Sequence, residues 1–436
     1  MTAYWCEQAL LPTGIASSVL VSVADGRFAS VEAGAEPGDA VRLGGLVIPG
    51  LANCHSHAFH RALRGRTQTE SGTFWTWREQ MYSVASVLTP DSYYRLARAV
   101  YGEMVLAGIT SVGEFHYLHH GPGGRRYDEP NAMGEALIAA ARDVGLRIAL
   151  LDTCYLAGGI DQPLNEVQKR FTDGDAVAWG ARVGQLSGAD DVVIGAAAHS
   201  VRGVPQDQLG AVAELLPEAP LHVHLSEQVA ENDACLAAYG RTPSQVLDET
   251  GFLSPRTSAV HATHLTSVDV GLLGSTGTHS CFCPTTERDL ADGIGPSVAL
   301  RDAGSPLTLG SDSHAVVDLF EEMRAVELDE RLASQQRGHW SALELLTAGT
   351  VTGHRSLGFS DAGVIEVGAR ADLVAVRLDS PRTAGTGGSV ETAVFAASAA
   401  DVTDVVANGV QVVAEGNHVK VAVGAELAAS IEAVTS

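Results

Sequence analysis

Residues 53–60 read NCHSHAFH and place His55, His57 and His60 directly after the apolar run GGLVIPGLA. Side chains two residues apart on an extended segment face the same side, so we expect His55 and His57 to bind one ion together. His60 lies three residues further on, where we expect the chain to turn, and it would face a bound ligand. The stretch therefore predicts a strand that ends in a pair of ion-binding side chains.

Short apolar or β-branched runs recur along the chain, and helical patterns separate most of them. The eight runs are LVIPGLA (46–52), ITSVGEF (109–115), LRIALLD (146–152), VVIGAAA (192–198), LHVHLS (221–226), SAVHAT (258–263), THSCFC (278–283) and PLTLGS (306–311). Strands that alternate with helices favour a parallel sheet. Eight such units predict an α/β protein with a (β/α)₈ barrel of the TIM type.

The clearest helix signal is TPDSYYRLARAVYGEMVLAG at residues 89–108. Thr89 is a preferred N-cap residue, Pro90 suits the first helical position, and Gly108 is typical of a helix end. Further helices are expected in NAMGEALIAAARDVG (131–145), PQDQLGAVAELLP (205–217) and TPSQVLDETG (242–251).

Both ends of the chain contain strand-like pieces with hairpin signals. They read SSVLVSVADGRF (17–28), GVIEVGARADLVAVRL (363–378) and DVTDVVANGVQVVAEG (401–416). Asp-Gly and Asn-Gly pairs mark tight hairpin turns. We therefore expect residues 1–48 and 363–436 to form a small β-sandwich-like domain beside a barrel at 49–362.

The formal net charge of −24 argues against nucleic acid and anionic membrane surfaces as partners. No apolar run reaches the roughly 18 residues that span a membrane, and the first residues lack the pattern of a secretory signal. Six cysteines in 436 residues do not indicate a disulfide framework. We expect a cytoplasmic protein with reduced thiols.

Polar residues lie near the carboxyl ends of the apolar runs, and in a barrel of this type that face carries the chemistry. They are His55, His57, Glu114, His116, Asp152, His199, His224, Glu227, His261, Cys283 and Asp312. We therefore expect these side chains to point into one mouth.

The chain resembles the amidohydrolase superfamily over nearly its whole length. PGLANCHSH, HVHLSEQ, VHATH, LGSDSH and VGARADLVAV occur in the order that this superfamily uses. HSHAFHRALRG, GTFWTWREQMY, GEFHYLHH and CPTTERDLADGIGP are similar to the formimidoylglutamate deiminase family. That resemblance implies metal-dependent hydrolysis of N-formimino-L-glutamate to N-formyl-L-glutamate and ammonia, a step of histidine degradation. Homodimers are common in the superfamily.

Three imidazoles and one carboxylate form the expected metal site. The ligands are His55, His57, His224 and Asp312. This donor set suits Zn²⁺ with a position left for water, although similar sites in the superfamily take Fe²⁺. Binuclear relatives carry a carboxylated lysine at the end of the fourth strand, where His199 stands here. The chain has only Lys169 and Lys420, both elsewhere, so we expect a single metal.

Asp312, Glu227 and His261 are the expected catalytic residues. Asp312 can take the proton of the attacking water, whose pKa a metal lowers towards 7. His261 can hydrogen-bond the attacking oxygen. Glu227 lies three residues past His224 and can protonate the leaving nitrogen, and such acid–base steps typically contribute about 10²–10⁴-fold.

Arginine can bind a carboxylate bidentately, and the expected substrate has two carboxylates. The resemblance assigns substrate contacts to Arg78, Arg202, Tyr117 and His199. His60 stands where family members carry glutamine, so N-formimino-L-aspartate remains an alternative substrate.

Two other functions stay open from the sequence. A deaminase of a ring such as guanine would share the fold and the metal, but it has less need of two convergent arginines. A non-catalytic metal-binding or scaffold protein would have no chemical need for Glu227, His261 and Asp312 together.

Overall fold

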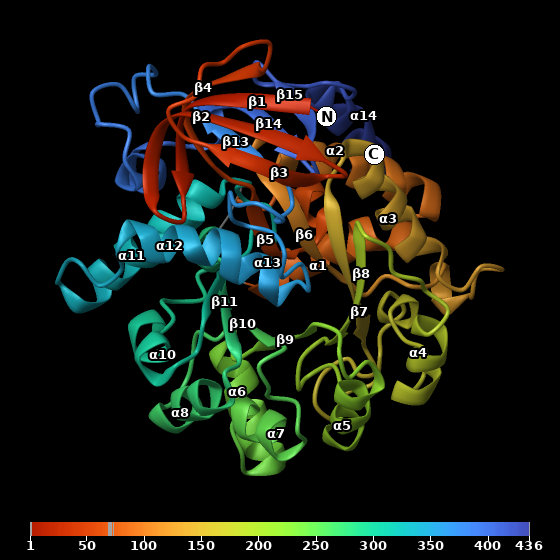
Figure 1. Ribbon diagram of the computed structural model, residues 1–436. Coiled ribbons are helices and arrows are strands. Elements are labelled where there is room, and N and C mark those ends of the chain that lie inside the picture. Colours follow the sequence, from red (N-terminus) through yellow and green to blue (C-terminus); the bar gives the residue numbers. More distant parts are fainter. Residues whose placement is uncertain (1, 69–71, 73, 436) are drawn as a thin grey trace.

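The computed structural model describes residues 2–68, 72 and 74–435, so Thr73 of the GTFWTWREQMY string lies outside the described residues. Two eight-stranded sheets organise the chain (Figure 1). One sheet is parallel, and its strands follow one another in sequence order. They are β5 (Leu51–Ser56), β6 (Ile109–His116), β7 (Arg147–Cys154), β8 (Val192–Ala198), β9 (Leu221–Leu225), β10 (Thr257–His261), β11 (His279–Phe282) and β12 (Leu307–Leu309).

The parallel sheet closes into the predicted barrel between its first and last strands. A parallel bridge joins Ser56 to Asp312. The Asp312 amide donates to the His55 carbonyl at 3.0 Å, and the His57 amide donates to the Asp312 carbonyl at 3.3 Å. The segments that carry three of the four expected ligands are thus hydrogen-bonded to one another.

Helices surround the barrel. They are α1 (Phe74–Val87), α2 (Pro90–Leu106), α3 (Ala132–Val144), α4 (Ala176–Val183), α5 (Gln206–Leu215), α6 (Val229–Tyr239), α7 (Pro243–Glu249), α8 (Ser267–Thr276), α9 (Pro284–Asp289), α10 (Ser297–Ala303), α11 (Leu319–Ser334), α12 (Ala342–Thr347) and α13 (Gly353–Ser356). The prediction for α2 is confirmed, because Thr89 and Ser92 form a capping box and Gly108 follows the helix with a φ of +87°. The other three predicted helices are confirmed as α3, α5 and α7.

The second sheet combines both ends of the chain in the order β16-β15-β14-β13-β4-β1-β2-β3. Its strands are β1 (Thr2–Leu11), β2 (Gly14–Ala24), β3 (Arg27–Glu32), β4 (Val41–Pro49), β13 (Leu373–Val376), β14 (Val402–Ala407), β15 (Val410–Ala414) and β16 (Asn417–His418). Asp25-Gly26 and Asn408-Gly409 form the predicted hairpin turns with positive φ angles. The final helix, α14 (Val423–Thr435), lies against α2 (Figure 1).

The first apolar run was wrongly predicted to be a single barrel strand. Leu46, Val47 and Ile48 belong to β4 and pair with β13, whereas the barrel strand starts at Leu51. The chain passes between the two sheets at Gly50, where a Cβ atom would lie only 2.3 Å from Oγ1 of Thr110. Every residue of the run is buried, and the Pro49-Gly50 pair, typical of a turn, is its only compositional sign of the crossing.

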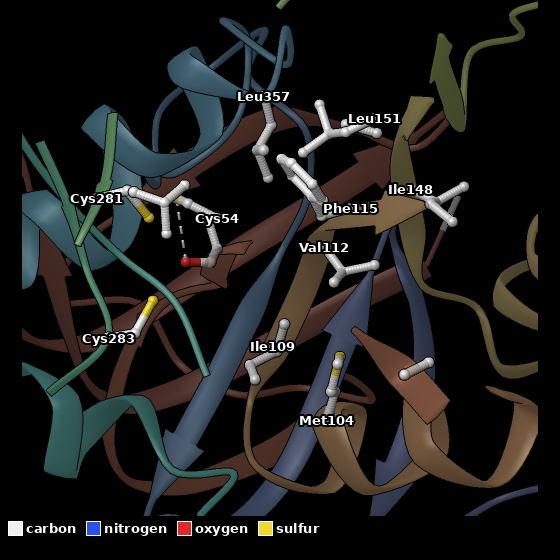
Figure 2. Close-up of a cluster of buried hydrophobic side chains, with 14 of the residues drawn as sticks. Cys54, Met104, Ile109, Val112, Phe115, Ile148, Leu151, Cys281, Cys283 and Leu357 are labelled. Atoms are coloured by element: carbon white, nitrogen blue, oxygen red, sulfur yellow. Dashed lines mark hydrogen bonds between the residues drawn. The ribbon is translucent and has the colours of Figure 1, made fainter. Parts of the chain in front are cut away.

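The barrel interior is apolar and contains several thiols. Figure 2 shows Cys54, Cys281 and Cys283 among the buried side chains around Phe115. All six cysteines are free and buried. Burial raises the pKa of Cys54 to about 12, so this thiol is neutral. Within the described part of the chain, no helix has the length and apolar composition needed to cross a membrane.

Candidate active site and metal centre

Four side chains from two barrel strands and the loop after a third converge at the carboxyl end of the barrel. His55 lies on β5 and His57 directly after it, His224 lies on β9, and Asp312 lies in the loop after β12. One donor atom of each side chain lies within 4.8 Å of those of the others. Nε2 of His224 lies 3.1 Å from Nε2 of His55 and 3.4 Å from Nε2 of His57. Oδ1 of Asp312 lies 3.4 Å from Nε2 of both His55 and His57.

These separations fit a shared metal ion. Tetrahedral zinc with bonds of about 2.05 Å places its donor atoms about 3.3 Å apart. Two backbone carbonyls orient the rings, because Nδ1 of His57 donates to Phe115 at 3.0 Å and Nδ1 of His224 donates to His199 at 2.9 Å. Each Nε2 is thereby left unprotonated and turned towards the other donors, as metal binding requires. Burial lowers the pKa of His57 to about 3, which also favours the neutral ring.

His261 lies among three carboxylates. Its Nε2 is 3.8 Å from Glu227 and 3.7 Å from Oδ2 of Asp312, and its Nδ1 is 3.4 Å from Glu287. Burial alone would lower the pKa of His261, but Glu227, Glu287 and Asp312 together raise it well above its ordinary value. The surrounding carboxylates thus favour the protonated form of this ring at the end of β10.

Glu227 and Asp312 have opposite proton affinities. Burial raises the pKa of Glu227, despite the opposing charges of His261 and Arg202. Burial would also raise the pKa of Asp312, but hydrogen bonding to His55 and the positive charge of His261 hold it below its usual range. One carboxyl thus favours the acid form and the other favours the anion, a division typical of acid–base sites.

Backbone strain is concentrated here. Ser226, His261, Asp312 and His314 have φ angles of +50°, +70°, +40° and +58°. Bulky residues rarely adopt such angles, and they persist only where the surrounding structure imposes them. The strained residues hold or flank the side chains of the cluster.

The cluster forms the floor of a cavity of about 420 Å³. The predicted residues that line it are His57, His60, Arg78, Tyr117, His199, Arg202, His224, Glu227, His261 and Asp312. His55 is fully buried beneath them. Nε2 of His60 and the Tyr117 hydroxyl lie 3.0 Å apart. Residues from β5, β6, β8, β9, β10 and the loops after them therefore share one mouth.

The two arginines of the cavity wall differ in their partners. The Arg78 guanidinium, on α1, lies 4.4 Å from the ring centre of Trp75 and 5.6 Å from that of Tyr82. No carboxylate of the described residues pairs with it. Arg202 instead forms ion pairs with Glu227 at 3.4 Å and with Glu231 at 3.1 Å.

Four further residues expected in the mouth do not line the cavity, although all are buried: Glu114, His116, Asp152 and Cys283. Cys283 lies beside His261 and Asp312. Asp152 accepts two hydrogen bonds from Arg182, at 2.8 and 2.9 Å. Phe115 of β6 and Tyr117, which follows this strand, face the cluster, so Glu114 and His116 project to the opposite side because side chains alternate along an extended segment.

Several residues of the site have no role in the sequence-based prediction. Glu287 contacts His261, and Tyr82, Tyr155 and Phe171 contribute to the aromatic wall. Glu287 stands four residues after Cys283 in the quoted CPTTERD string, so that string contained the signal. Tyr82 ends the quoted GTFWTWREQMY string, whereas Tyr155 and Phe171 belong to no quoted motif and reach the cavity only through loop geometry.

Comparisons with known proteins agree with this architecture. A model of the amidohydrolase family matches residues 46–412. Formimidoylglutamate deiminase of Pseudomonas aeruginosa is 35% identical, with 96% of each chain covered. An 8-oxoguanine deaminase of the same organism is 30% identical over 78% of this chain and 76% of its own. The crystal structure of an amidohydrolase from Brucella melitensis, 31% identical, matches over 100% of both chains with a TM-score of 0.93.

Proposed function

This chain belongs to the amidohydrolase family, and we propose that it hydrolyses the C=N bond of N-formimino-L-glutamate, giving N-formyl-L-glutamate and ammonia. Deaminases of both linear amidines and purine rings are similar to this chain. The choice between these substrates therefore depends on the cavity of this chain.

The observation that carries the proposal is the state of Arg78. Its guanidinium lies in the cavity wall against two aromatic faces, and none of the described carboxylates neutralises it. A cation held in this way is preorganised for an anion, and guanidinium geometry matches a carboxylate. A neutral purine would leave this charge without a counter-ion among the described residues.

The metal centre that we propose consists of His55, His57, His224 and Asp312, with Zn²⁺ as the preferred ion. When bound, such an ion lowers the pKa of a water molecule towards 7 and so supplies the nucleophile at neutral pH. Three neutral imidazoles and one carboxylate are the donor set that zinc favours, and Fe²⁺ is the alternative.

Asp312, His261 and Glu227 carry the proton transfers in this proposal. The Oδ2 atom of Asp312 faces His261 and accepts the proton of the attacking water. The protonated His261 donates to the attacking oxygen and offsets the charge that develops there. Glu227, whose pKa burial raises, is the group that delivers a proton to the leaving nitrogen.

The remaining polar residues of the cavity orient the substrate in this proposal. Arg78 binds one carboxylate bidentately, and Tyr117 with His60 contributes hydrogen bonds from the adjacent wall. Arg202 and His199 face the second carboxylate. Because Arg202 is ion-paired with Glu227 and Glu231, it binds the substrate carboxylate less strongly than an unpaired arginine would.

A ring deaminase is the second candidate, and the aromatic wall favours it. Trp75, Trp77, Tyr82, Tyr117, Tyr155 and Phe171 all line the cavity. Such side chains can stack on a planar base. They can also shield an amidine from bulk water, so the wall alone does not decide.

Ammonia release by the purified, zinc-loaded protein tests the proposal. N-formimino-L-glutamate, N-formimino-L-aspartate, guanine and 8-oxoguanine would be compared at equal concentration. We expect a kcat/KM for the glutamate compound at least about 10²-fold above the others, since a lost carboxylate contact costs several kcal/mol. Turnover confined to the aspartate compound would indicate a shorter pocket at His60. Turnover confined to a purine would overturn the proposal.

A further inference from the structure

The side chain between the two histidines of the H-x-H pair joins a buried hydrogen-bond chain. Ser56 Oγ donates to Oε2 of Glu114 at 2.7 Å. The amide of Ala58 donates to Oε1 of the same carboxylate, also at 2.7 Å. Nε2 of His314 donates to Ser56 Oγ at 2.9 Å. All these side chains are completely buried, with 0% relative exposure.

We propose that Glu114 is a positioning residue for the metal centre. Its two oxygens accept from the Ser56 hydroxyl and from the Ala58 amide, so the carboxylate fixes the chain on both sides of His57. Through Ser56 the contact extends to His314, two residues past Asp312. The chain Glu114–Ser56–His314 thus connects the β5 segment to the loop that supplies the fourth ligand.

The geometry explains why a carboxylate is needed. Two donors approach two different oxygens, so both oxygens of Glu114 must accept. An amide in its place could accept from Ala58 and would then offer its NH₂ group to Ser56. Ser56 Oγ already accepts from His314, so its own proton would lose its acceptor. An unsatisfied buried donor is costly, and the loop would shift to relieve it.

A shift of this loop would change the ligand distances. The His57 amide donates to the Asp312 carbonyl and the Asp312 amide to the His55 carbonyl, so the two segments move together. Asp312 and His314 both have positive φ angles, which the surrounding contacts must maintain. Glu114 does not line the cavity, so it acts through the ligands and not on the substrate.

Zinc affinity is the direct test. The dissociation constant of the full-length protein would be measured by chelator competition for the wild type, Glu114→Gln, Ser56→Ala and the double variant. We expect a 10–100-fold weaker affinity for Glu114→Gln, as for other residues that orient metal ligands, and a smaller loss for Ser56→Ala. The double variant should resemble Glu114→Gln, because both changes break one chain of contacts.

Glu327→Gln is the matched control. Glu327, on α11, is a fully buried carboxylate that accepts the amides of Gly338 at 2.9 Å and Trp340 at 2.8 Å, and it does not line the cavity. Its substitution should lower the melting temperature without changing zinc affinity.

Wild-type zinc affinity in folded Glu114→Gln, or an equal loss in Glu327→Gln, would overturn the proposal. If Glu114→Gln does not fold, Ser56→Ala decides, and wild-type affinity there would overturn it too. The inference rests on the proposed metal centre but not on the substrate. Zinc binding therefore distinguishes its failure from that of the proposed reaction.

Discussion

Nε2 of His261 lies 3.7 Å from Oδ2 of Asp312, whereas Oδ1 of the same carboxylate faces Nε2 of His55 and His57. The two oxygens of Asp312 are thus divided between the histidine pair and the acid–base group. This division predicts that metal binding and proton transfer can be separated by mutation.

His261→Asn should keep the metal and lose turnover. Asparagine can still donate a hydrogen bond, but it cannot carry the positive charge that Glu227, Glu287 and Asp312 maintain on the ring. We expect kcat to fall about 10²–10³-fold, the usual effect of removing one group that stabilises a developing negative charge. Zinc content, measured by elemental analysis, should stay at the wild-type level. A zinc-depleted variant would show that His261 supports the ligands instead.

Glu227→Gln should lower kcat by about 10²–10⁴-fold, because the amide cannot deliver a proton to the leaving nitrogen. KM should change little, since the side chains have the same shape. The nearby Glu231→Gln is the matched control, because Glu231 contacts Arg202 but not His261. Steady-state ammonia release measures both variants, and unchanged turnover in Glu227→Gln would contradict the mechanism.

Most of the candidate site could be predicted because the barrel topology determines where the residues after each strand lie. The carboxyl ends of parallel strands meet at one rim, so motifs far apart in sequence, such as those around His57 and His224, come together without further information. The predicted hairpins and α2 followed from local turn and cap residues in the same way.

What could not be predicted depends on strand phase and on long-range pairing. Glu114 and Asp152 lie near strand ends as expected, but their side chains point away from the cavity. Only the register of the closed barrel determines which side of the strand each side chain occupies. The ion pairs of Arg202 with Glu227 and Glu231 depend on the path of the loop before α5 and on the start of α6. The switch of sheets at Gly50 has one local signal, the Pro49-Gly50 pair, inside a run that is otherwise continuously apolar.

Arg78 variants should change substrate binding more than turnover. Arg78→Lys keeps the charge but loses the bidentate fork, and we expect KM for N-formimino-L-glutamate to rise about 10-fold. Arg78→Met removes the charge, and a rise of about 100-fold, or 2.7 kcal/mol, is expected. Because the interaction is present in both the ground state and the transition state, kcat should change less. Arg95→Met, on the exposed face of α2, is the control. Equal KM values in Arg78→Met and Arg95→Met would remove the basis for an anionic substrate.

Asp173 predicts a defined dependence of stability on pH. Burial alone would raise the pKa of its carboxyl, but a hydrogen bond from His120 and the charge of Arg182, whose Nε lies 2.9 Å away, lower it to about 2. The folded-state pKa is therefore below the unfolded value of about 3.9. Such a group stabilises the fold fully above the unfolded pKa, and the contribution is lost as pH falls through the folded pKa.

The matched measurement is the free energy of unfolding of wild type and Asp173→Asn between pH 7 and pH 2. We expect Asp173→Asn to be less stable by about 2 kcal/mol at pH 7, with the difference shrinking below about pH 4 and disappearing near pH 2. Asp379→Asn removes an exposed ion pair with Arg377 and should leave stability nearly unchanged at every pH. A difference between wild type and Asp173→Asn that stays constant from pH 7 to pH 2 would show that Asp173 acts through packing and not through its charge.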